Sequence, residues 1–110
     1  MPSYLMQVAY SAEGLAAIIK NPEDRTEAVR KPIEKLGGKL QSAWFTFGEY
    51  DVAVILDMPD NVSAAAIALA FGGGGACKSV KTTPLLSPAE ALEALKKAGG
   101  AGYKPATAKK

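Results

Sequence analysis

The chain has 110 residues, 48% of them hydrophobic and 22% charged, which predicts one soluble globular domain. Its net charge of +2 hides an asymmetry: residues 96–110 hold five Lys and no acid, whereas residues 1–95 carry 8 basic and 11 acidic groups. No apolar run approaches the roughly 18–20 residues of a membrane span, and the first residues lack a signal-peptide pattern. We therefore expect a cytoplasmic protein that contacts no membrane.

Histidine is absent from the sequence. This absence excludes a histidine proton shuttle, a Ser-His-Asp or Cys-His nucleophile, a histidine-ligated haem and the usual zinc sites. Cys77 is the single cysteine, which excludes an internal disulfide and a cysteine metal cluster. Without histidine, any chemistry would rest on carboxylates, Lys, Tyr, Cys77 or a bound cofactor. We predict no metal site and no cofactor.

The first half of the chain predicts one strand followed by two short helices. Residues 3–10 alternate in polarity as a strand does, and Ser11 is a suitable N-cap for the first helix. Asn21-Pro22 breaks that helix and favours the start of the second one. Pro32 lies inside the second apolar stripe, where it should kink or split the helix, and Gly37-Gly38 ends it.

The second half predicts a β-hairpin, a helix, a further strand and a terminal helix. Residues 39–47 and 51–57 form the hairpin around a glycine-containing turn. Residues 62–71 form an alanine-rich helix, and residues 76–83 form the fourth strand. The segment Ser87-Pro88-Ala89-Glu90 has the pattern of a capping box, which starts a helix that runs to about residue 98.

This order of elements indicates an α+β fold of the ferredoxin-like, split βαβ type. Such a fold has a four-stranded antiparallel sheet with helices on one face, here with an additional C-terminal helix. Residues 1–98 are predicted to form the domain. Residues 99–110, which are rich in Ala, Gly, Pro and Lys, are predicted to form a flexible basic tail.

The hairpin from Trp44 to Leu56 is hydrophobic at both its inward and its outward positions. A sheet with one wet face would instead alternate between apolar and polar side chains. The chain can cover one sheet face with its own helices. The other face is also apolar, so we expect a second copy of the chain to cover it. We expect a homodimer or a higher homo-oligomer.

The turn Gly48-Glu49-Tyr50-Asp51 resembles the signature of the GYD-domain family of small bacterial proteins. The resemblance covers about residues 3–95 and extends to Tyr10-Ser11-Ala12-Glu13-Gly14, Leu36-Gly37-Gly38-Lys39-Leu40, Asp57-Met58-Pro59-Asp60-Asn61 and the segment 80–90. It implies a dimeric α+β barrel, in which two ferredoxin-like sheets pack face to face. It implies no particular reaction and no set of catalytic residues.

Three polar residues have both a functional and a structural interpretation. Tyr50 and Asp51 could form a hydrogen-bond donor and an acid at the mouth of a pocket. Alternatively, Asp51 accepts backbone N–H groups and stabilises the turn. Lys81, which we expect on the same strand face as Cys77, could hold an anionic group. On an edge strand, Lys81 would instead be a solvated side chain that discourages further strand pairing. The structural interpretation of Cys77 is a small buried hydrophobic residue.

Two functions from different classes follow. The first is a homo-oligomeric module, either structural or binding a small apolar or anionic ligand. Its pocket lies between sheet and helices and is lined by residues from the set Tyr10, Trp44, Tyr50, Asp51 and Lys81. The alternative is a cofactor-free enzyme, monooxygenase- or isomerase-like, acting on a small apolar or aromatic molecule. In it Tyr50 donates a hydrogen bond, Asp51 is the base and Lys81 holds an anion. Nucleic-acid binding is disfavoured, because the sheet segment is not basic and lacks the RNA-binding signature.

Overall fold

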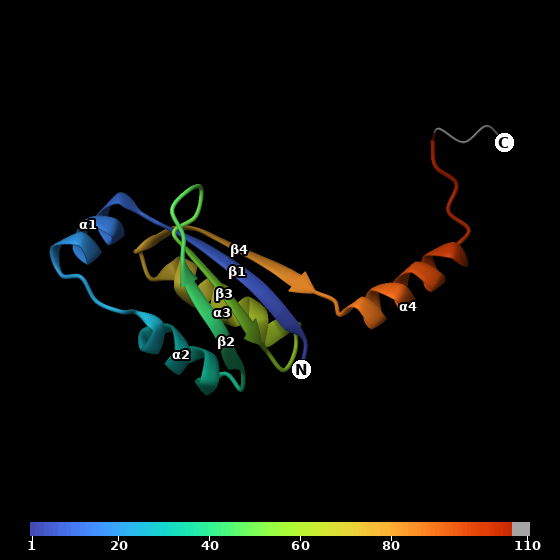
Figure 1. The fold of residues 1–110 in the computed structure, drawn as a ribbon, viewed down its shortest axis with the longest axis horizontal. Helices are drawn as coiled ribbons and strands as arrows, with labels where there is room; N and C mark the ends of the chain where they lie inside the picture. Colours follow the sequence, from blue (N-terminus) through green and yellow to red (C-terminus); the bar gives the residue numbers. More distant parts are fainter. Residues whose placement is uncertain (107–110) are drawn as a thin grey trace.

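The computed structural model describes residues 1–106 and contains one four-stranded antiparallel sheet in the order β2-β3-β1-β4 (Figure 1). The strands are β1 (Ser3–Tyr10), β2 (Lys39–Phe45), β3 (Val52–Asp57) and β4 (Cys77–Leu85). The helices are α1 (Ala12–Lys20), α2 (Thr26–Lys35), α3 (Asn61–Gly73) and α4 (Pro88–Gly99). The predicted α+β, ferredoxin-like arrangement with an additional C-terminal helix is confirmed.

The core lies between the sheet and helices α2 and α3. Along β1, alternate side chains point into it, and Tyr4, Met6 and Val8 are buried while the residues between them are half-buried. Ile33 of α2 and Ile67 of α3 close the core from the helix side, both with no exposed surface. Burial of these side chains is the main term that stabilises the domain.

Several helix and strand boundaries differ by a few residues from the sequence-based prediction. α2 begins at Thr26, later than Pro22 suggested, because the Asp24 carboxylate accepts hydrogen bonds from the Thr26 backbone N–H at 2.9 Å and from its hydroxyl at 2.6 Å. Pro32 lies within α2, which it does not split. β4 runs to Leu85 and includes Pro84, which a strand at the edge of a sheet tolerates.

A β-bulge in β4 places Lys81 on the opposite face of the sheet from Cys77, whereas the sequence predicted the same face. The register between β1 and β4 shifts at Ala9 and Tyr10, so that Tyr10 pairs with Cys77 while Gln7 pairs with Lys81. Cys77 therefore packs against the core, whereas Lys81 lies on the opposite face of the sheet and is exposed. The expectation that Cys77 and Lys81 share one face is wrong, because strict alternation fails where an extra residue enters a strand.

The sheet face opposite α2 and α3, called the open face below, combines an apolar band with a polar edge. Its apolar side chains come from all of the three strands β1, β2 and β3: Leu5, Trp44, Ala53 and Ile55. At one end, the Asp57 carboxylate accepts hydrogen bonds from the Ser3 hydroxyl at 2.6 Å and from the Gln41 amide at 2.7 and 2.8 Å. These bonds, chiefly that from Ser3, lower the pKa of Asp57.

The C-terminal part of the chain extends away from the sheet and its covering helices (Figure 1). No residue of α4 is buried. Residues 101–106 form no helix or strand, and residues 107–110 of the predicted tail lie outside the described residues. Among residues 1–106, no helix is long and apolar enough to cross a membrane.

Gly14 permits a close contact between α1 and the strand connection before β4. A Cβ atom added at Gly14 would lie within 3 Å of the Ala76 carbonyl oxygen, which also accepts a 2.8 Å hydrogen bond from the Ser11 backbone N–H. We expect Gly14→Ala to lower the free energy of unfolding by about 1–3 kcal/mol through overpacking. Urea unfolding measures this change, and Gly48→Ala is the control because a Cβ at Gly48 meets nothing within 4 Å. Equal stability of the two variants would contradict the close contact.

Candidate functional site

A cleft with largely apolar walls lies between the sheet and α2. It consists of two adjoining hollows of about 290 and 220 Å³. Five residues line both hollows: Tyr10, Arg25, Val29, Val52 and Val54. We call this site the Tyr10 cleft. Its size is near the lower limit of small-ligand pockets, which hold about 300–1,000 Å³.

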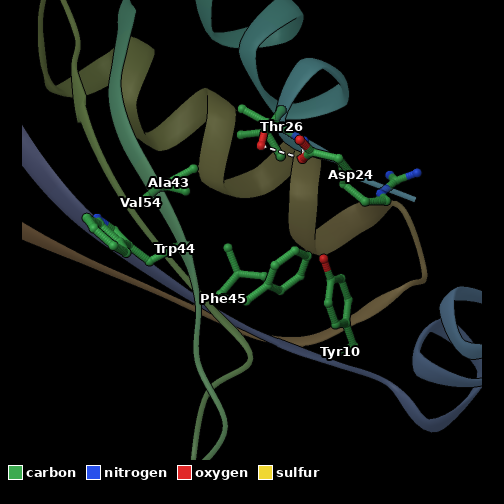
Figure 2. A pocket seen from close by; sticks show the side chains of 10 residues that line it. Tyr10, Asp24, Thr26, Ala43, Trp44, Phe45 and Val54 are labelled. Carbon is green, nitrogen blue, oxygen red and sulfur yellow. Dashed lines mark hydrogen bonds between the residues drawn. The ribbon is translucent and has the colours of Figure 1, made fainter. Parts of the chain in front are cut away.

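The strand alternation of β2 and β3 builds the apolar wall of the Tyr10 cleft. Val52 and Val54 both point toward the helices, and Phe45 pairs with Val52 across the hairpin. Figure 2 shows the Phe45 and Tyr10 rings close together on one side of β2, with the Trp44 ring on its other side. One strand therefore presents Phe45 to the cleft and Trp44, of which 66% is exposed, to the open face.

The polar groups of the Tyr10 cleft lie at its rim. Burial raises the pKa of Tyr10, partly offset by the Arg25 guanidinium, so the phenol stays neutral at physiological pH and can donate or accept a hydrogen bond. Arg25 forms a surface ion pair of 3.1 Å with Glu23. The Asp24 carboxylate accepts hydrogen bonds from the Thr26 N–H and hydroxyl at the start of α2 (Figure 2).

Cys77 lines the second hollow as an ordinary thiol. Burial raises its pKa, although the Arg25 charge opposes this effect. A reactive cysteine needs the opposite shift, because the thiolate is the nucleophile. Cys77 is therefore a half-buried packing residue of the cleft wall.

Asp51 has the structural role that was one of its two interpretations from the sequence: it accepts a backbone N–H group at the turn. Its carboxylate accepts a 2.8 Å hydrogen bond from the Tyr10 backbone N–H, and its own N–H donates to the Val8 carbonyl at 2.8 Å. Its carbonyl also accepts the Thr46 N–H at 2.8 Å. Asp51 thus joins the β2–β3 loop to the end of β1 and fixes the backbone that carries Tyr10.

Of the five residues selected from the sequence, Tyr10 and Trp44 line the cleft, and the other three lie elsewhere. Tyr10 lines both hollows, and Trp44 lines the first one, although its ring lies on the other side of β2 from the Phe45 ring (Figure 2). Tyr50 lies in the β2–β3 loop, where its carbonyl accepts the Thr46 hydroxyl at 2.7 Å, beside the structural Asp51. Lys81 lies on the open face.

Sequence reasoning missed most of the residues that line the Tyr10 cleft, among them Phe45, Arg25 and Val29. Phe45 could have been found from the alternation of the hairpin, since it has the opposite orientation to Trp44. Arg25 and Val29 depend on how α2 lies against the sheet, which no local pattern indicates. Among residues 1–106, no group of three or more Cys, Asp or Glu side chains could hold a metal ion.

These features define an α+β domain of the ferredoxin-like class with a small cleft between its sheet and helices. The model of the GYD domain family matches residues 4–95, which is most of the chain. The protein belongs to the GYD domain family, in agreement with the resemblance at Gly48-Glu49-Tyr50-Asp51. A search of curated proteins found no match to this chain.

Proposed function

We propose that this GYD-family protein is a homo-oligomeric module that binds a small, mostly apolar molecule in the Tyr10 cleft. The observation that carries the proposal is the pair of adjoining hollows with five common lining residues. Ligand sites usually combine apolar walls with a few well-placed polar groups, and this cleft has that composition.

The lining favours a ligand with an aromatic or branched apolar body and one polar or anionic group. Val29, Val52 and Val54 would contact the body, next to the exposed face of Phe45. At the rim, the neutral Tyr10 hydroxyl offers a hydrogen bond. The Arg25 guanidinium offers a positive charge in addition to its surface pair with Glu23.

The proposed assembly is a homodimer in which two open faces pack together as a dimeric α+β barrel. The apolar band of the open face supports it, since Leu5, Ala53 and Ile55 are only half-buried in one chain. Trp44 adds an exposed aromatic ring to the same surface. Aromatic residues are enriched at protein interfaces, where they bury much area at little entropic cost.

Binding is favoured over the enzymatic alternative by the placement of the polar residues. The enzyme would need Tyr50, Asp51 and Lys81 around one substrate. The Asp51 carboxylate instead accepts a hydrogen bond from the Tyr10 backbone N–H. Lys81 lies on the other face of the sheet. A general base must reach the proton that it removes, and Asp51 is engaged elsewhere.

The test uses 2-naphthoate, which has an aromatic body and one carboxylate, in a titration followed by two-dimensional amide NMR. We expect the largest shift changes at the cleft residues Tyr10, Val29 and Val52. Ala43 lies in the first hollow, so Ala43→Phe should fill it and weaken binding at least about tenfold. Ala65→Phe, on the exposed side of α3, is the control and should bind normally.

Either of two results would contradict the binding proposal. One is the absence of any shift change at millimolar naphthoate, a concentration that detects even weak binding. The other is a set of shifts that maps to the open face, around Leu5 and Ile55, and persists in Ala43→Phe. The dispersion of the amide spectrum reports whether each variant is folded, so a loss of binding in a folded variant is specific to the cleft.

A further inference from the structure

Helix α4 has no packing partner within its own chain. None of its residues is buried, and its two leucines, Leu92 and Leu95, are 54% and 69% exposed. They lie three residues apart and therefore on one side of the helix. Leu86, just before the helix, is 62% exposed. The helix thus carries an apolar stripe away from the core of the molecule (Figure 1).

The sequence nevertheless specifies α4 strongly. The Ser87 hydroxyl accepts the Glu90 N–H at 3.1 Å, and the Glu90 carboxylate accepts the Ser87 N–H at 2.9 Å, which completes a capping box. Pro88 occupies the first turn, and basic residues occupy the last. A helix of 12 residues is still marginal in water without packing along one face, so α4 requires a partner surface.

The chain exposes more surface than a compact monomer of the same mass. The chain exposes 7825 Å², whereas a compact monomer of 11.4 kDa would expose about 5,800 Å². Its radius of gyration is 17.7 Å, against about 13 Å for a compact domain of this length. The excess of roughly 2,000 Å² includes the segment after α4. It exceeds the about 800 Å² that each partner buries in a standard interface.

The approach to α4, at Leu85 and Leu86, adjoins the open face. A hollow of about 580 Å³ lies where they meet. Ile55 and Gln41 line it from the sheet, and Leu85, Leu86 and Glu90 line it from the approach to α4 and its first turn. A second copy seated on the open face would therefore meet α4 at its side.

We infer that α4 is a clasp that packs its Leu92 and Leu95 side chains on a second copy of this chain. The inference rests on the homodimer of the proposed function and extends its interface beyond the sheet. Two-fold symmetry makes the contact reciprocal, so each copy contributes one α4 and receives the other. The clasp accounts for the strong capping of a helix that stabilises nothing in its own subunit.

The test compares Leu92→Asp with Ala94→Asp in the full-length protein by sedimentation equilibrium. Both substitutions add one carboxylate to α4, but Ala94 lies about 200° around the helix from Leu92. Leu92→Asp should raise the dimer dissociation constant at least about tenfold, whereas Ala94→Asp should leave it unchanged. Because Leu92 is exposed in the single chain, the sheet domain of the separated subunits should stay folded, and circular dichroism should record at most the loss of the α4 helix.

Three results would overturn the clasp and are distinguishable. A wild-type dimer that Leu92→Asp leaves intact would remove the clasp but keep the sheet-to-sheet dimer. A wild-type monomer at every concentration would remove the proposed assembly itself. A compact wild-type monomer that Leu92→Asp makes less stable would show that α4 folds back onto its own chain.

Discussion

Val54→Asp is expected to leave most of the protein unfolded at 25 °C. Val54 is 2% exposed and packs in the core beside Leu56 and Met6, with no cationic group among its buried neighbours. An unpaired carboxylate at such a position costs several kcal/mol. The free energy of unfolding of natural domains is only about 5–15 kcal/mol, so the substitution removes much or all of the stability of the folded state. Circular dichroism and urea unfolding measure the loss.

The control is Ala53→Asp, one residue earlier on β3. Ala53 points to the open face, so the same carboxylate reaches the solvent of a single chain. The variant should stay folded, with a much smaller loss of stability than that of Val54→Asp. If both variants unfold at the same urea concentration, the assignment of the two sheet faces is contradicted.

Trp44→Asp is expected to separate the proposed dimer without unfolding its subunits. The Trp44 side chain is 66% exposed and lies on the open face, where an aromatic ring would anchor the interface (Figure 2). Loss of such an anchor typically costs 2 kcal/mol or more, which corresponds to an increase in the dissociation constant of about 30-fold. Sedimentation across a range of concentrations gives this constant.

Val62→Asp is the matched control for Trp44→Asp. Val62 is 79% exposed but belongs to α3, on the helix-covered side of the sheet, so the dimer should tolerate a charge there. An equal effect of the two substitutions would place the interface elsewhere. An unchanged dissociation constant for Trp44→Asp would exclude the open face as the contact surface.

The fold was largely predictable because its signals are local. The alternation in residues 3–10 places Tyr4, Met6 and Val8 in the core, and hydrophobic periodicity is the primary signal of secondary structure. The capping box at Ser87 starts α4 at the predicted position. The structural reading of Asp51 was also accessible, since Asp in a glycine-containing turn commonly bonds backbone N–H groups.

The site was less predictable because it depends on register and on helix placement. One bulge opposite Ala9 and Tyr10 moved Lys81 to the other face relative to Cys77, and bulges have no reliable signature in a single sequence. Arg25 enters the cleft only because α2 lies against β2. Phe45 and Trp44 are neighbours in sequence, yet their opposite orientations assign them to the cleft and to the open face.

The most direct test of a homo-oligomeric, ligand-binding module is native mass spectrometry of freshly purified, untagged protein. We expect a species at twice the chain mass of 11.4 kDa, with a reproducible excess mass that is released on denaturation and identifies the molecule in the Tyr10 cleft. A single species at the mass of one chain, without any excess, would contradict both the assembly and the binding function.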